Sequence, residues 1–109
     1  IHANSSTSSS LAGTSTYYYV PTYLEYQREA RRSLAFALQQ ALVARLGLPD
    51  KGVRQANFAV LRATEMPSAL VELAFISNPY EEQLLADPAF RSLAARALVE
   101  GIVDFLAWH

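Results

Sequence analysis

Ala69-Leu70-Val71-Glu72-Leu73-Ala74-Phe75-Ile76-Ser77-Asn78-Pro79 is a short apolar run that contains a single carboxylate, Glu72. It follows Met66-Pro67-Ser68 and ends in turn-forming residues, a pattern that predicts a strand covered on both faces within an α/β sheet. A carboxylate in such a strand loses hydration, which is costly unless a cation, a metal or hydrogen-bond donors compensate. The strand alone leaves two interpretations open: Glu72 pairs with an arginine or lies at a wet strand end, or it is catalytic.

The composition indicates one domain and excludes several kinds of partner. The chain has 109 residues, of which 51% are hydrophobic, and its formal charge is −1. Because it has no block of Lys or Arg, we expect neither nucleic acid nor an anionic membrane surface as a partner. No apolar run is long enough to cross a bilayer, so we do not expect membrane insertion. With no cysteine, disulfides and thiolate sites are excluded.

The first part of the sequence predicts two strands, a loop and a long helix. Ile1–Asn4 is typical of the end of a strand whose beginning lies outside the sequence, and the polar stretch 5–16 predicts a mobile surface loop. The tyrosines of 17–20 predict a second strand, which Pro21 ends. Thr22 and Glu25 form a capping-box pattern that begins a helix reaching about Leu46, where Gly47 caps it. Its buried stripe is predicted to be Leu34, Leu38, Ala41, Leu42 and Leu46, with its charged residues facing solvent.

The second part predicts a turn at 49–52, a third strand at 58–61 and the strand that carries Glu72. Asn78 followed by Pro79 begins a short helix, and Asp87 followed by Pro88 begins the last one. The apolar face of that last helix comprises Phe90, Ala94, Ala97, Leu98, Ile102, Phe105 and Leu106. Strands that alternate with helices predict an α/β fold, a mixed sheet flanked by helices. We expect it to be truncated on its N-terminal side.

Two chemically capable residues, His2 and Glu72, are each predicted at a strand end. Residues from different strands of an open α/β sheet meet where those strands end. A single histidine is more often structural than a metal ligand. Because His109 is terminal and cysteine is absent, this chain by itself does not supply a conventional three-ligand zinc site.

The sequence resembles zinc-dependent N-acetylmuramoyl-L-alanine amidases, the peptidoglycan amidases of bacterial cell separation that also occur in phage endolysins. Four segments carry the resemblance, in the family's order: Ile1-His2-Ala3-Asn4, Gly13-Thr14-Ser15-Thr16-Tyr17-Tyr18, Gln55-Ala56-Asn57-Phe58-Ala59-Val60-Leu61-Arg62 and residues 66–78, Met66 to Asn78. The segment around Glu72 is the most specific. Ala74 stands where many members have glycine, a departure that leaves the chemistry unchanged.

The resemblance implies that His2 is a zinc ligand and that Glu72 is the catalytic glutamate. The family's two other ligands, a histidine and a glutamate, precede the segment that matches here, so residues 1–109 are expected to be the C-terminal part of a single catalytic domain. That domain cleaves the amide between N-acetylmuramic acid and L-alanine with zinc-activated water. The implied partners are peptidoglycan and either the missing N-terminal part of the domain or a swapped copy. The implied location is periplasmic, in the cell envelope or secreted.

Further expectations concern the loop and three polar residues. Some relatives insert an autoinhibitory helical segment where this chain has only its Ser/Thr loop, so we expect no silencing helix there. Asn4 is predicted to orient the His2 segment. Asn57 and Arg62 are candidates for a substrate groove, although ordinary polar roles at a sheet edge are more common.

Two other functions remain open from the residues. One is a non-catalytic relative of the same fold that binds peptidoglycan or regulates other hydrolases. The other is a structural α/β domain in which Glu72 pairs with Arg54 or Arg62. Absence of zinc from an intact preparation, with Glu72 replaceable at no loss of activity, distinguishes the structural domain from the amidase.

Overall fold

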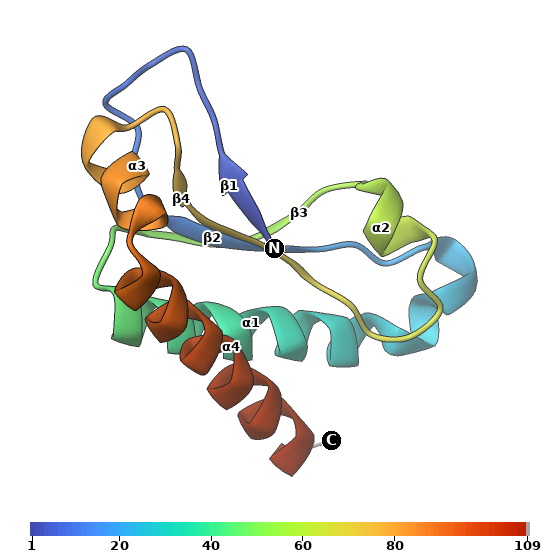
Figure 1. Ribbon diagram of the computed structural model, residues 1–109. Helices are drawn as coiled ribbons and strands as arrows, with labels where there is room; N and C mark the ends of the chain where they lie inside the picture. The colour runs from blue at the N-terminus through green and yellow to red at the C-terminus, as the bar shows by residue number, and fades with distance from the viewer. Residues whose placement is uncertain (109) are drawn as a thin grey trace.

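The computed structural model describes residues 1–108, in which four strands form one mixed sheet (Figure 1). The strands are β1 (His2–Asn4), β2 (Thr14–Tyr18), β3 (Asp50–Gln55) and β4 (Leu70–Phe75), in the spatial order β1-β4-β2-β3. β4 pairs parallel with β1 and antiparallel with β2, and β3 pairs parallel with β2. The predicted α/β class with a mixed sheet is therefore confirmed.

The helices are η1 (Thr22–Gln27, a 3-10 helix), α1 (Arg28–Leu46), α2 (Ala59–Arg62), α3 (Pro79–Ala86) and α4 (Pro88–Trp108). α1 and α4 lie together on one side of the sheet, whereas the loop that follows β1 rises on the other side (Figure 1). Within residues 1–108, none of these helices combines the length and the hydrophobicity needed to cross a membrane.

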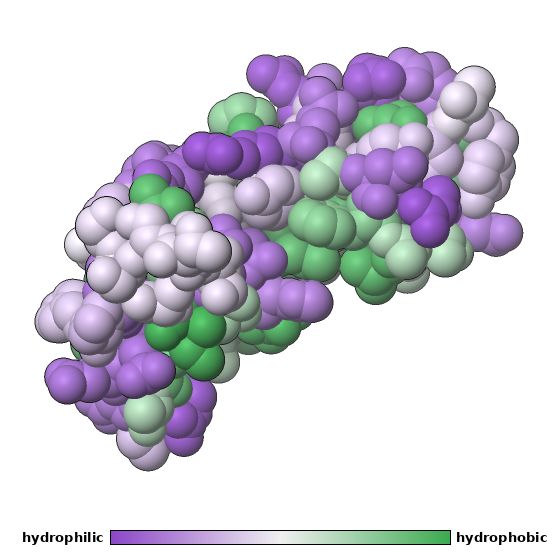
Figure 2. Space-filling view, turned by 90° about the horizontal axis from the view of Figure 1, so that it is seen from above, coloured by the Kyte–Doolittle hydropathy of each residue, from purple (hydrophilic) through white to green (hydrophobic). Residues whose placement is uncertain are grey.

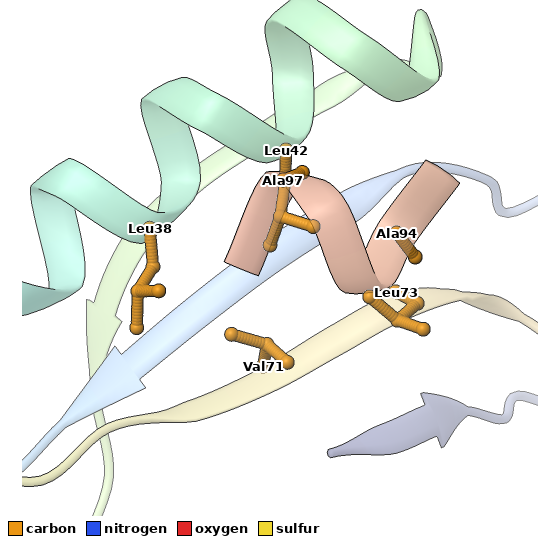
Figure 3. Close-up of a cluster of buried hydrophobic side chains, with 6 residues drawn as sticks. All are labelled: Leu38, Leu42, Val71, Leu73, Ala94 and Ala97. Carbon is orange, nitrogen blue, oxygen red and sulfur yellow. The ribbon is translucent and has the colours of Figure 1, made fainter. Parts of the chain in front are cut away.

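The main apolar core lies between the sheet and the two long helices. Its buried side chains come from three elements and point toward one another (Figure 3): Leu38 and Leu42 from α1, Val71 and Leu73 from β4, and Ala94 and Ala97 from α4. Leu34, Ala41 and Leu46 pack against this cluster, so the predicted stripe of α1 is confirmed. Alternation of side chains along a strand directs the residue between Val71 and Leu73, which is Glu72, to the opposite face.

The two ends of the long helix differ in how well the sequence predicted them. Gly47 adopts a left-handed conformation, with φ 68°, and its N–H donates to the carbonyl of Val43, which confirms the predicted cap. The predicted capping box is wrong. Pro21 occupies the N-cap of η1 without a side-chain hydrogen bond, and Glu25 instead pairs with Arg28 one turn on. A 3-10 segment therefore precedes the regular helix.

Two polar residues of α1 are buried, and one of them, Arg31, contradicts the prediction that the charged residues of this helix face solvent. The guanidinium of Arg31 is fully buried and donates to the carbonyls of Tyr19, Leu61, Thr64 and Met66. These hydrogen bonds hold the segment before β4 in place. Burial lowers the pKa of Arg31. The amide of Gln39 accepts from Thr16 Oγ1 and donates to the carbonyl of Thr14, so it holds β2 on the helix. Periodicity does not show such partners, because they come from distant segments.

Three strand assignments require correction. β2 spans Thr14–Tyr18 rather than 17–20, so residues 14–16 belong to the sheet and not to the loop. Residues 50–55 form edge strand β3 where the sequence predicted a turn at 49–52, and residues 59–62 form helix α2 where it predicted a strand at 58–61. Thr14, Ser15 and Thr16 of β2 are buried although they are polar, whereas edge strand β3 is polar and exposed or half-buried, so local hydrophobicity marked neither segment as a strand.

The predicted starts of the last two helices are confirmed. Asn78 Oδ1 accepts from the N–H groups of Tyr80 and Glu81, and Asp87 Oδ1 accepts from the N–H of Ala89. The predicted apolar face of α4 is buried only in its first half, at Phe90, Ala94 and Ala97. Ile102 and Leu106 are exposed, because α4 extends beyond the part of α1 that it crosses (Figure 1).

Candidate active site

Glu72 lies on the face of the sheet opposite the helical core, on the central strand β4. Its side chain is half-buried, and burial raises the pKa of its carboxyl above the usual range. Its Oε2 atom is buried and, among the described residues, has no hydrogen-bond partner. An unpaired buried carboxylate oxygen is costly, so a proton, a donor or a cation at this atom would be strongly favoured.

His2 lies directly beside Glu72. The two residues are opposite one another in the parallel pair β1–β4, so their side chains project from the same face of adjacent strands. His2 is exposed, and its imidazole opposes the effect of burial on the pKa of Glu72. The pair that the sequence singled out is therefore brought together by one strand pairing.

A β-bulge in β4 follows Glu72 immediately. His2 is opposite Glu72 but Asn4 is opposite Phe75, so β4 holds one extra residue between these two pairs. Leu73 and Ala74 consequently both pack in apolar clusters that include residues of α4, and Phe75 returns to the face that carries Glu72. The bulge places an aromatic wall next to the carboxylate.

Side chains of α3 and β2 replace the backbone pairing that the bulge interrupts. The antiparallel ladder with β2 ends at Ser15, which is opposite Glu72. Beyond it, the N–H of Phe75 donates to Glu81 Oε1 at 2.7 Å, and the N–H of Gly13 donates to Glu81 Oε2 at 2.9 Å. Thr14 Oγ1 donates to the carbonyl of Leu73 at 2.9 Å. Glu81 lies in the first turn of the helix predicted to begin at Asn78 and Pro79, and no sequence signal marked its burial.

A hollow of about 250 Å³ opens on the same face. The hollow reaches Ser15, the residue opposite Glu72. Figure 2 shows that hydrophilic and hydrophobic residues are intermixed on this face. The walls of the hollow are aromatic, polar and basic with one aliphatic side chain: Asn4, Leu11, Ser15, Tyr17, Phe75, Lys51 and Arg54. The sequence predicted no site role for Ser15 or Lys51, and it considered Arg54 only as a partner of Glu72 in a structural domain. Ser15 was assigned to the loop, and β3 was not recognised as a strand.

The other polar candidates make local contacts. Arg62 Nη1 donates to Asn57 Oδ1 at 2.7 Å, and Arg54 Nε donates to the carbonyl of Lys51 at 3.1 Å. The structural-domain alternative requires an ion pair between Glu72 and one of these arginines. Within residues 1–108, neither arginine forms it. Asn4 Oδ1 accepts the N–H of the next residue, Ser5, at 2.9 Å, directly after β1.

The loop between β1 and β2 is exposed but attached at two points. The N–H of Ser6 donates to Ser77 Oγ at 3.1 Å, and Asn78 Nδ2 donates to the carbonyl of Leu11 at 3.3 Å. Both contacts join the loop to the turn that follows β4. The polar sequence of this loop is therefore tied to the end of the strand that carries Glu72.

The donor set of this site fits part of a zinc centre. An imidazole and a neighbouring carboxylate with an unpaired oxygen are suitable groups for that ion. No cluster of three His, Cys, Asp or Glu residues suited to a metal occurs within residues 1–108, and His109 lies outside the described residues. His2 is thus a candidate for one ligand of such a site.

The sequence matches the Amidase_3 family, described as N-acetylmuramoyl-L-alanine amidase, over residues 1–104. The chain belongs to this amidase family. It is 40% identical over 105 residues to the N-acetylmuramoyl-L-alanine amidase LytC of Bacillus subtilis, a match covering 96% of this chain and 20% of LytC. Over 80 residues it is 44% identical to the N-acetylmuramoyl-L-alanine amidase AmiC of Neisseria meningitidis. This match covers 72% of this chain and 19% of AmiC.

Solved structures of amidases share the fold. The catalytic domain of CwlV from Bacillus (Paenibacillus) polymyxa var. colistinus superimposes with a TM-score of 0.83 at 36% identity, and an amidase from Clostridium difficile 630 with 0.87 at 26%. Each match covers 96% of this chain and 54% of the solved chain. The chain thus spans about half of these amidase structures and about a fifth of LytC and AmiC.

Proposed function

We propose that the protein to which residues 1–109 belong is a peptidoglycan hydrolase that cleaves the amide between N-acetylmuramic acid and L-alanine. Family membership supports the reaction class. The observation that carries the proposal is the position of Glu72, a half-buried carboxylate with an unpaired oxygen next to His2 on the open face of the sheet. A carboxylate in this environment is suited to accept and return a proton.

Glu72 is the general base of this proposal. The unpaired Oε2 takes a proton from the water that attacks the amide carbonyl, and the same carboxyl then delivers it to the departing amine. Burial raises the pKa of Glu72, which strengthens it as a base relative to an exposed glutamate and makes its protonated form a competent acid. Because Glu72 is opposite His2 of β1 on one side and Ser15 of β2 on the other, the carboxylate is held on backbone that is paired with both neighbouring strands.

His2 is a zinc ligand in this proposal. Zinc supplies a Lewis acid that activates water near neutral pH and polarises the substrate carbonyl. The position of His2 beside Glu72, on the same face of the sheet, supports this assignment. The remaining ligands come from residues before Ile1, so residues 1–109 form the C-terminal part of a single catalytic domain. This agrees with the 54% coverage of the solved amidases.

The partner of the complete protein in this proposal is peptidoglycan. The complete protein therefore acts outside the cytoplasm in this proposal, which the names of related cell wall amidases support. A periplasmic, envelope-bound or secreted location follows from the same proposal. The two tethers of the Ser/Thr loop also favour an open site without a silencing helix between β1 and β2.

The first test is Glu72→Gln in the intact protein. The amide keeps the shape of the side chain but cannot serve as the base, so we expect peptidoglycan hydrolysis to fall at least about 100-fold. Stability should not decrease, because the substitution removes a buried unpaired charge. Release of new amino termini from purified cell wall measures the reaction, and exposed Glu82→Gln is the matched control. Near-normal turnover by Glu72→Gln refutes the proposal.

The second test is His2→Ala in the same intact protein. Loss of one imidazole ligand should weaken zinc binding by at least about tenfold, measured by zinc titration against a competing chelator. His109→Ala is the control for nonspecific loss of a histidine. Unchanged zinc affinity in His2→Ala excludes His2 as a ligand, and zinc-free intact protein would favour a non-catalytic peptidoglycan-binding relative.

A further inference from the structure

Two basic side chains lie on the face that carries Glu72 and remain unused by the proposed chemistry. Lys51 and Arg54 belong to β3 and line the hollow that also reaches Ser15 and Phe75. Within residues 1–108, neither has a carboxylate in ion-pair contact. The hollow therefore has two positive charges without a protein counter-ion, and it is suited to an anionic ligand group.

The backbone around Gly13 fixes the position of Lys51. Gly13 has φ 116°, and a Cβ there would lie 2.4 Å from the carbonyl oxygen of Pro49 and 3.0 Å from Lys51 Cγ. Only glycine permits this close approach of the loop to β3. The stem of Lys51 is consequently held against the start of β2, on the side where the hollow opens.

Strand order gives the spacing between these charges and the proposed base. β4 carries Glu72, β2 lies next to it, and β3 is the following strand, with Arg54 opposite Tyr17 of β2. Two interstrand spacings amount to roughly 10 Å. An extended peptide advances roughly 3.3–3.6 Å per residue, so that distance corresponds to about three residues.

We propose that Lys51 and Arg54 form a carboxylate-binding subsite that recognises an acidic residue of the stem peptide, two or three residues beyond the amide that is cleaved. This inference rests on the proposed amidase function. The peptide crosses β2 and β3 away from His2, with Tyr17 and Phe75 as walls. Arg54 is exposed and Lys51 half-buried, so the contact contributes to selectivity and to substrate affinity more than to the chemical step.

The test uses the intact zinc-loaded protein and muramoyl peptides of equal length. One series has a free carboxylate at the second or third residue, and the other has a carboxamide at that position. We expect the carboxylate peptide to show a KM lower by roughly tenfold, with kcat nearly unchanged, and the difference to shrink as salt rises. Lys51→Gln and Arg54→Gln should each reduce this preference, and the double variant should abolish it.

Matched controls separate charge from folding. Lys51→Arg keeps the charge and should retain the preference, whereas exposed Arg96→Gln on α4 should leave KM unchanged. Equal cleavage of both peptides by the unsubstituted protein, or an unchanged preference in the double variant, would overturn the subsite. Inhibition by inorganic phosphate as strong as that by the acidic peptide would also overturn it, because a peptide site should favour the peptide.

A binding measurement distinguishes failure of the subsite from failure of the amidase function. Calorimetry of the acidic stem peptide and its carboxamide with the intact protein requires no cleavage. If the intact protein cleaves neither peptide but binds the acidic one selectively, and the double variant loses this selectivity, the amidase function is refuted and the subsite is retained. Normal cleavage with equal binding of both peptides would refute the subsite alone.

Discussion

Buried charged residues in this protein are neutralised by backbone groups rather than by opposite charges. The carboxylate of Glu81 is 1% exposed and accepts the N–H groups of Gly13 and Phe75, while the fully buried Arg31 donates to four carbonyls. Each charge joins segments that are distant in sequence. Hydrogen bonds to charged groups are worth more than neutral ones, and losing one partner leaves the others unsatisfied. These residues therefore support the strand that carries Glu72 from either end.

Glu81→Gln tests this support at the level of one atom. The amide has one acceptor oxygen and directs an NH2 group toward an N–H, so we expect a loss of about 1–2 kcal/mol in the free energy of unfolding. Denaturant unfolding of the intact protein measures it. Adjacent Glu82 is exposed, and Glu82→Gln should change stability little. Equal stability of the two variants would show that the Glu81 contacts with Gly13 and Phe75 contribute nothing.

At the level of elements, α1 and α4 cross closely because Gly101 lies at their contact. A Cβ at Gly101 would be 2.9 Å from Leu38 Cα and 3.0 Å from the carbonyl oxygen of Ala37. Both are backbone atoms, so a side chain there cannot be accommodated by a change of rotamer. The helices would have to separate, which would disturb the cluster that contains Leu38 and Leu42.

Gly101→Ala should therefore destabilise the protein even though alanine is the better helix former. Overpacking costs about 1–3 kcal/mol, and the gain in helix propensity offsets up to about 1 kcal/mol of it. A fall in the midpoint of thermal unfolding checks the sign. Ala95→Leu enlarges an exposed position of the same helix and should be nearly neutral. An increase in stability of Gly101→Ala would mean that the helices separate without cost.

For the whole molecule, the free edge of β1 and the exposed end of α4 are two surfaces that favour association with other protein. β1 pairs with β4 on one side and is the outermost strand of the sheet described by residues 1–108. Val99, Val103 and Trp108 of α4 are exposed by 58–85%. An unpaired strand edge and exposed apolar side chains each favour association. We propose that the remainder of the catalytic domain covers these surfaces in the complete protein.

Residues 1–109 produced alone should therefore self-associate, exchange a segment with a second copy, or unfold at lower temperature than the intact protein. Light scattering after size-exclusion chromatography measures the association, and calorimetry measures the unfolding temperature. Adding a separately produced N-terminal part should restore a monomeric complex. A monomer as stable as the intact protein would contradict this expectation.

The sequence by itself determined the central strand, the buried stripe of α1, the glycine cap and the caps of the last two helices, because these depend on local patterns. Glu72 was recognisable because a carboxylate in an apolar run is anomalous, and His2 because its segment resembles the amidase family. Tertiary structure alone decided the pairing that places His2 beside Glu72, the bulge after Glu72, and the burial of Arg31, Gln39 and Glu81. The reason is physical: the buried polar residues of β2 and α1 resemble solvent-facing residues until distant segments supply their hydrogen-bond partners.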